Sequence, residues 1–132
     1  MIKGRCECGG VAYQVDGDIN DFSHCHCSQC RRIHGAAFAS YAGVAKTAFE
    51  YLPGKGAVAS YASSESHSRV FCPICGSSIM VQLDSEPNDF YLAMGTMDGE
   101  LELPPGYHIY VGSKAPWHTI EDDLPQYDTE LQ

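Results

Sequence analysis

Short runs of apolar and β-branched residues alternate with turn residues along the chain, and no convincing long helix interrupts them. The runs with strand composition are residues 11–15, 36–44, 49–52, 58–61, 68–71, 79–83, 90–94 and 107–111. Clusters of glycine, proline and aspartate, such as those at 16–18 and 53–54, mark turns between the runs. This pattern predicts a mainly β fold built from short strands.

Three segments allow a more specific prediction. Residues 58–61 and 68–71 flank a serine-rich turn, which predicts a hairpin whose second strand leads into Cys72. The small and aromatic residues of 36–44 are typical of a buried strand, with a short helix as the alternative because of their alanines. A short helical turn is expected at 32–34.

Length and charge limit the class of protein. With 132 residues and no linker or repeat, the chain is expected to form a single domain over residues 1–132. No stretch approaches the roughly 18 apolar residues of a membrane span, and the first residues contain no apolar region of signal-peptide type. We therefore expect a cytoplasmic protein with no membrane partner. The formal charge of −9, with 8 Lys and Arg against 17 Asp and Glu, argues against a nucleic-acid partner, because such proteins carry a basic face.

Cysteine spacing carries most of the functional information. The chain has seven cysteines, an odd number that would leave one thiol unpaired in a disulfide framework. Thiolates at short spacing in a reducing compartment instead indicate metal ligands. The seven divide into a central group of three and two flanking pairs, namely Cys25/Cys27/Cys30, Cys6/Cys8 and Cys72/Cys75.

The flanking pairs predict a structural zinc site. Two turns that each present two thiolates can enclose a tetrahedral ion completely, which is typical of structural zinc. Proline and glycine around Cys72 and Cys75 favour the tight turn that such a site needs. The alternative for this pair is a redox-active C-x-x-C motif, which the second short-spaced pair at Cys6 and Cys8 makes less favoured.

The central group predicts a second zinc with a vacant coordination position. Three thiolates leave one tetrahedral position open, and an open position distinguishes catalytic from structural zinc. A small thiol substrate that filled this position would be held as a thiolate near neutral pH, ready for chemistry at a carbon–sulfur bond. The alternative is a closed site in which a histidine is the fourth ligand, the candidates being His24, His26 and His34.

Residues outside the cysteine groups provide further candidates. Arg31, which with Arg32 forms the only cationic pair, could bind a substrate carboxylate bidentately beside the metal. A solvated surface pair is the alternative. His34 is a second candidate for substrate binding. Trp117 is expected to pack against other residues more readily than to line a cleft, and the acids Glu121, Asp122 and Asp123 are expected to form a hydrated tail.

The motifs together resemble a known family. In order, they are Cys6-x-Cys8-Gly9-Gly10, His24-Cys25-x-Cys27-x-x-Cys30-Arg31, Cys72-x-x-Cys75-Gly76-Ser77 and His108-Ile109-Tyr110-Val111-x-Ser113-Lys114-Ala115-x-Trp117. The set is similar to that of the glutathione-dependent formaldehyde-activating (GFA) family, which includes centromere protein V. The resemblance implies a β-tent of antiparallel sheets with two Zn²⁺ sites. It also implies a structural zinc on the flanking pairs and a second zinc on the central group, where glutathione would meet formaldehyde.

The residues and the resemblance lead to one functional hypothesis and one alternative. We expect a zinc-dependent carbon–sulfur lyase that acts on a small thiol adduct, similar to S-(hydroxymethyl)glutathione synthase, with glutathione as the thiol that the resemblance implies. The alternative is a non-catalytic, zinc-stabilised binding module of the same fold. The fourth ligand of the central metal distinguishes the two, because an exchangeable ligand favours an enzyme and a protein imidazole favours a module.

Overall fold

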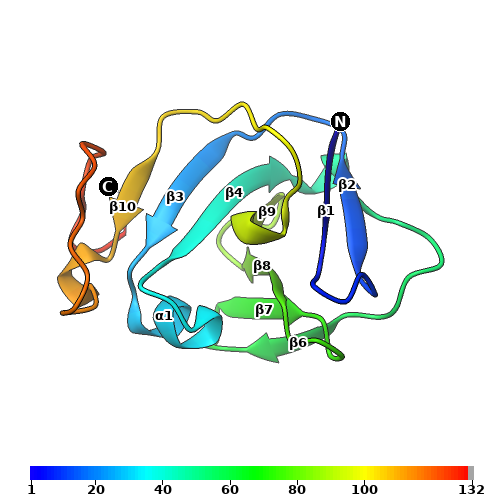
Figure 1. Ribbon diagram of the computed structural model, residues 1–132, viewed down its shortest axis with the longest axis horizontal. Coiled ribbons are helices and arrows are strands. Elements are labelled where there is room, and N and C mark those ends of the chain that lie inside the picture. Colours follow the sequence, from blue (N-terminus) through cyan, green and yellow to red (C-terminus); the bar gives the residue numbers. More distant parts are fainter. Residues whose placement is uncertain (131–132) are drawn as a thin grey trace.

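The structure is a computed structural model, which describes residues 1–130, and it is mainly β as predicted. The described part of the chain contains ten strands in two sheets, one α-helix and three short 3-10 helices (Figure 1). The helical elements are α1 (Ser28–His34), η1 (Lys46–Ala48), η2 (Met94–Thr96) and η3 (Val111–Ser113). None of the described helices is long and apolar enough to cross a membrane.

The strands form a small and a large sheet. The small sheet has the order β1 (Ile2–Arg5), β2 (Ala12–Val15), β5 (Phe49–Tyr51). The large sheet has the order β10 (Tyr107–Ile109), β3 (Asp21–Cys25), β4 (Ala39–Ala45), β9 (Asp89–Ala93), β8 (Ser78–Leu83), β7 (His67–Phe71), β6 (Ala59–Ala62). Residues 36–44 thus contribute to a strand and not to the alternative helix. The β6–β7 hairpin confirms the prediction for the serine-rich turn.

The sheets are antiparallel, as the resemblance implies, except at one edge. β10 pairs with β3 in parallel, with Tyr107 opposite Ser23 and Ile109 opposite Cys25. The reason is the long connection after η2, which crosses to the far edge of the large sheet before β10 begins (Figure 1). The chain therefore enters β10 from the end at which β3 starts.

Two apolar clusters form the core, and each contains cysteines from one of the two groups. The first cluster joins the sheets, since Tyr13 from β2 and Leu92 from β9 both belong to it, and it includes Cys6 and Cys72. The second cluster contains Cys25, Cys30, Ala39, Tyr41 and Val81. The buried cysteines of both groups are therefore held by the apolar core.

The acids Glu121, Asp122 and Asp123 are exposed, as expected of a hydrated tail, but the backbone of the segment that follows them pairs with β10. β10 lies at an edge of the large sheet, where unpaired N–H and C=O groups need partners. The tail supplies them, because the His108 N–H donates to the Pro125 carbonyl at 2.8 Å and the Tyr127 N–H donates to the His108 carbonyl at 2.9 Å. Asp122 also accepts hydrogen bonds from the His108 ring. The backbone of the tail is therefore held at this edge of the sheet, while its acidic side chains stay exposed.

Candidate metal centres

The flanking cysteine pairs come together as the spacing predicts. The Sγ atoms of Cys6, Cys8, Cys72 and Cys75 all lie within 4.8 Å of one another. Cys8 Sγ is 3.6 Å from Cys6 Sγ and 3.8 Å from Cys72 Sγ. A tetrahedron with metal–sulfur bonds of about 2.3 Å has edges of about 3.8 Å, so these sulfurs fit a zinc ion.

Backbone geometry creates this four-sulfur group. Gly9 and Gly76 have φ values of 76° and 81°, which other residues rarely adopt. The turns direct N–H groups at the sulfurs, because Val11 donates to Cys6 Sγ at 3.2 Å and Gly10 donates to Cys8 Sγ at 3.4 Å. Such donors stabilise thiolates and leave the four sulfurs well suited to a cation.

Ser77 connects the two turns of the four-sulfur group. Its hydroxyl accepts a hydrogen bond from the Glu7 N–H at 3.0 Å and lies 3.2 Å from Cys75 Sγ. Hydrogen bonds from the Ser77 hydroxyl and from the backbone N–H groups of Cys8 and Ser77 lower the pKa of the Cys75 thiol to about 5. These hydrogen bonds favour the thiolate form of Cys75, which is the form that binds a metal.

The central group is also assembled, and it comes from the β3–α1 junction. Cys25 ends β3, Cys27 is the N-cap of α1, and Cys30 lies in the first turn of that helix. Their three Sγ atoms lie within 4.8 Å of one another. The Cys30 N–H donates to Cys27 Sγ at 3.3 Å, so a sulfur serves as the capping group. The helix begins at Ser28, four residues before the helical turn that the sequence predicts.

In the central group, the pKa of one thiol is lowered while the pKa of its neighbour is raised. Hydrogen bonds from the thiols of Cys25 and Cys30 lower the pKa of Cys27 far below its ordinary value. Hydrogen bonds to Cys27 and Cys30, together with burial, raise the pKa of Cys25. One thiolate therefore opposes the ionisation of the next, and a bound cation would relieve this repulsion. The donor set fits a zinc ion, which prefers sulfur.

No histidine among the described residues joins the central group. The rings expected as alternatives have other partners. His24 Nδ1 is 2.7 Å from the Ser40 hydroxyl, His26 Nε2 is 2.8 Å from His108 Nδ1, and His34 Nε2 is 3.3 Å from the Tyr41 hydroxyl. In the described part of the chain, no histidine nitrogen therefore lies within 4.8 Å of all three sulfurs.

A hydrogen-bonded chain of two histidines and an aspartate holds the segment between Cys25 and Cys27. His26 is 0% exposed, and burial, followed by the positive charge of nearby groups, lowers its pKa to about 4. His108 Nε2 lies 3.1 Å from both carboxylate oxygens of Asp122. His26 Nε2 lies 2.8 Å from His108 Nδ1, so the two rings and Asp122 form one hydrogen-bonded chain. The C-terminal segment thereby fixes the residue between Cys25 and Cys27.

Sequence reasoning missed Arg69, which contacts the central group directly. Its side chain is 6% exposed. Nη1 donates to Cys30 Sγ at 3.4 Å and to the Tyr41 hydroxyl at 2.9 Å, and that hydroxyl lies 3.2 Å from Cys30 Sγ. Burial opposes the charge of Arg69, but the adjacent Cys30 and Tyr41 raise its pKa. A buried guanidinium therefore offsets the negative charge of the three-sulfur group, whereas the four-sulfur group has the exposed Cys8 and Cys75 in contact with solvent.

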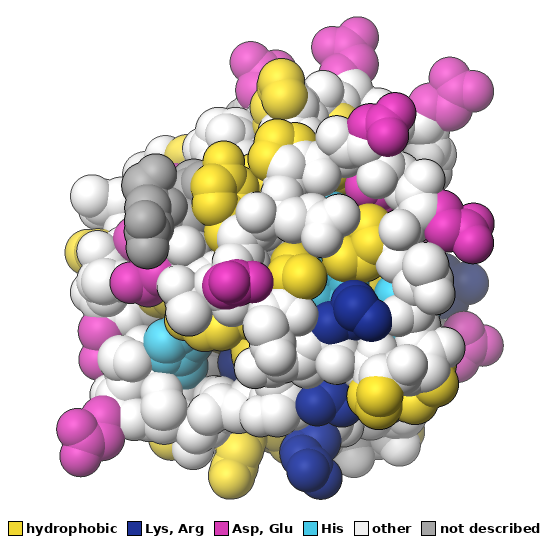
Figure 2. Space-filling view, turned by 90° about the vertical axis from the view of Figure 1, so that its left-hand side faces the viewer, with side chains coloured by type: hydrophobic (Ala, Val, Ile, Leu, Met, Phe, Trp, Pro, Cys, Tyr) yellow, Lys and Arg dark blue, Asp and Glu magenta, His cyan; other side chains and the backbone are white. Residues whose placement is uncertain are grey.

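The two cations proposed from sequence lie elsewhere. Arg31 is half-buried on α1, and its Nε has no hydrogen-bond partner among residues 1–130. Arg32 is exposed. On the face shown in Figure 2, a few Lys and Arg side chains lie near the centre of the lower half, while Asp and Glu side chains lie mainly towards the edges. Trp117 is 72% exposed, so the expectation that it packs against other residues is wrong.

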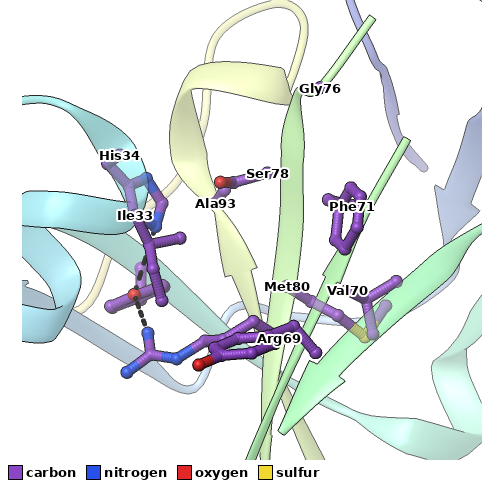
Figure 3. Close-up of a pocket in the computed structure, with 11 residues that line it drawn as sticks. Ile33, His34, Arg69, Val70, Phe71, Gly76, Ser78, Met80 and Ala93 are labelled. Carbon is purple, nitrogen blue, oxygen red and sulfur yellow. Dashed lines mark hydrogen bonds between the residues drawn. The ribbon is translucent and has the colours of Figure 1, made fainter. Parts of the chain in front are cut away.

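A cavity of about 310 Å³ lies beside the central group. Figure 3 shows Ile33 and His34 of α1 on one side of the cavity and Val70 and Phe71 of β7 on the other. The dashed lines mark the bonds from the Tyr41 hydroxyl to Arg69 and to His34. His34, a residue predicted to bind substrate, therefore lines this cavity, whereas Arg31 does not.

The fold and the two cysteine groups define a class of protein: a mainly β domain with two candidate metal sites. A family model described as glutathione-dependent formaldehyde-activating enzyme (GFA) matches residues 1–113. The chain belongs to this family. The crystal structure of a Rhodobacter sphaeroides protein is similar, with a TM-score of 0.62 and 27% sequence identity, over 74% of this chain and 89% of that chain. Among curated proteins, no match is found.

Proposed function

We propose that the protein binds two zinc ions and uses the second for carbon–sulfur chemistry on a small thiol and its aldehyde adduct. Cys6, Cys8, Cys72 and Cys75 would hold a structural ion, and the central group of Cys25, Cys27 and Cys30 would hold the second. Family membership supports a reaction related to glutathione and formaldehyde. The observation that carries the proposal is the three-sulfur group without a fourth protein ligand among the described residues.

The reaction is an addition and its reverse. The thiol sulfur forms a bond to the aldehyde carbon, the carbon–oxygen π bond breaks, and the thiol proton ends on the new hydroxyl oxygen. No oxidant or reductant is needed. Zinc held by three thiolates would supply a position at which an incoming thiol loses its proton near neutral pH.

Residues of this chain would stabilise a thiolate at that position and contact the substrate. Arg69 donates to Cys30 Sγ and offsets the negative charge that an additional thiolate brings. Burial and the charge of Arg69 lower the pKa of His34, so its ring is neutral and can accept or donate a hydrogen bond beside Tyr41. We assign His34 to substrate contact because it lines the cavity. Carboxylate binding by Arg31 stays a prediction, based on its unpartnered Nε.

Zinc thiolate chemistry also fits the state of the cysteines. All seven are free thiols in the structure. Free, closely spaced thiols persist in reducing compartments, and we propose that the protein works in the cytoplasm.

Cobalt substitution tests the proposal against the binding-module alternative. We expect 2-mercaptoethanol or glutathione to add a sulfur-to-cobalt absorption band in the cobalt-loaded protein. We also expect the zinc-loaded protein to accelerate exchange between ¹³C-formaldehyde and its thiol adduct, as measured by NMR. The Cys27→Ser variant should lose both effects. A spectrum that no thiol changes, together with exchange at the uncatalysed rate, would favour the non-catalytic module.

A further inference from the structure

The cavity beside the central group is close to the proposed ligands of the second zinc. It lies between α1, which carries Cys30, and β7, which leads into Cys72. Two of its lining residues, Tyr41 and Arg69, contact Cys30 Sγ directly. A molecule in the cavity is therefore one side chain away from the proposed second zinc ligands.

We propose that this cavity holds the body of the substrate, and that it selects a compact, largely apolar thiol or aldehyde adduct over a charged tripeptide such as glutathione. This inference rests on the proposed function, because it assumes that the central group receives a thiol. It goes beyond that function by naming the chemical class of the thiol and the residues that recognise it.

The hydrogen-bond donors of Arg69 limit how it can recognise a ligand. A guanidinium has five N–H donors. Nη1 uses two of them on Cys30 Sγ and the Tyr41 hydroxyl, Nε donates to the Ser63 hydroxyl at 3.0 Å, and Nη2 donates to Gln29 Oε1 at 3.4 Å. One donor remains. Arg69 can therefore donate one further hydrogen bond, to a single ligand oxygen, but cannot bind a carboxylate bidentately without breaking existing bonds.

The remaining walls of the cavity favour apolar groups. Val70, Phe71, Met80 and Ala93 line it together with Ile33, which is partly exposed (Figure 3). Among residues 1–130, no Asp, Glu or Lys lines it. Glutathione carries two carboxylates and an ammonium group, and the cavity offers no anion for the ammonium. Removing these charges from water without partners is costly, whereas an aromatic or aliphatic group gains from burial.

The size of the cavity agrees with a compact ligand. Its volume of about 310 Å³ is at the lower end of the range of about 300–1,000 Å³ for small-molecule sites. A ring with a short linker to sulfur suits this space. A tripeptide would have to leave its charged ends outside.

The test compares three thiols on the full chain loaded with cobalt. Benzyl mercaptan has an apolar body, 2-mercaptoethanol has almost none, and glutathione has a charged one. Absorption of the cobalt–thiolate band gives the affinity of each without relying on turnover. We expect benzyl mercaptan to bind at least about tenfold more tightly than the other two, from the apolar area it buries.

Two variants localise that preference to the cavity. Ser78 lines the cavity and makes no side-chain hydrogen bond to the described residues, so Ser78→Phe should fill the space. We expect it to remove the advantage of benzyl mercaptan while the affinity for 2-mercaptoethanol stays unchanged. Ile33→Glu at the partly exposed wall should weaken benzyl mercaptan binding without filling the core. Ser85→Phe, in an exposed loop, is the matched control and should change nothing.

The outcomes separate the two proposals. If glutathione binds as tightly as benzyl mercaptan, or if a folded Ser78→Phe or Ile33→Glu protein keeps the preference, the cavity assignment is wrong while the proposed function stands. If none of the three thiols produces a cobalt–thiolate band, the proposed function fails and the cavity assignment fails with it. Melting curves identify any variant that does not fold, and the other variant then decides.

Discussion

Replacement of Arg69 by methionine tests whether a buried cation stabilises the central thiolate group. Methionine keeps much of the length and volume of the side chain but removes its charge and all five donors. The change deletes the bond to Cys30 Sγ at 3.4 Å and leaves the Tyr41 hydroxyl without its donor at 2.9 Å. The negative charge of the three sulfurs would then lack its nearest cation.

The size of the effect follows from the bond to sulfur. A hydrogen bond that involves a charged group contributes about 1.5–3 kcal/mol. In binding terms, this corresponds to a loss of roughly 10- to 150-fold in the affinity of the central group for zinc. Loss of a residue that supports metal ligands typically costs about 10–100-fold, which is the same order. The four-sulfur group has no contact with Arg69 and should keep its affinity.

Competition with a chromogenic chelator measures both sites in one titration, because the two ions should leave in separate steps. Arg32→Met is the matched control, since it removes the same charge from an exposed position on α1. We expect the zinc affinity of the central group to fall by at least tenfold in Arg69→Met and to stay within about twofold in Arg32→Met. Equal shifts in both variants would show that net charge, and not the contact with Cys30, is responsible. An unchanged zinc affinity of the central group in Arg69→Met would refute the reasoning.

Three further predictions concern the two cysteine groups and the small sheet. Cys75→Ala should lower the melting temperature by well over about 10 °C, because zinc binding at a structural site contributes directly to the free energy of folding. Cys27→Ser should reduce the zinc content from two to one and lower the melting temperature less. Equal melting curves for the two variants would contradict these roles. His34→Ala should leave the zinc content at two, and a loss of one zinc would restore the closed-site alternative. Gly4→Ala should cost about 1–3 kcal/mol in chemical unfolding, because its Cβ would lie 2.3 Å from a buried tyrosine ring, and Gly95→Ala, which has open space, should cost much less.

The cysteine groups could be predicted from sequence because short spacing almost determines their geometry. Two sulfurs separated by one or two residues in a glycine-containing turn must lie close together, and the pairing of Cys6/Cys8 with Cys72/Cys75 then follows from the number of ligands that zinc needs. The β6–β7 hairpin was equally accessible, since both strands and their turn are local in sequence.

Arg69 could not be predicted in the same way, because its role depends on contacts distant in sequence. It follows Cys30 by 39 residues and lies in a strand, where an arginine usually faces solvent. In β7, however, the adjacent Arg69 and Val70 are both buried, because successive side chains of a strand point to opposite faces and both faces are covered here. Val70 belongs to the first apolar cluster, whereas Arg69 contacts Cys30 and Tyr41 of the second, and no local sequence signal marked this.

The tail shows a second limit, in which composition predicted the exposure of the acids but not the pairing of the backbone with β10. Its acidic residues favour water, but the edge of β10 offers backbone groups that composition does not reveal. The parallel pairing of β10 with β3 was inaccessible for the same reason, since it depends on the route of a long connection.

Zinc-edge X-ray absorption, on protein loaded with two zinc ions, tests most directly whether one thiolate site is closed and the other receives a thiol. The account predicts an average of fewer than four sulfur ligands per zinc in the free protein, rising to four when benzyl mercaptan is added. Four sulfurs or a histidine signal in the free protein, unchanged by the thiol, would contradict it.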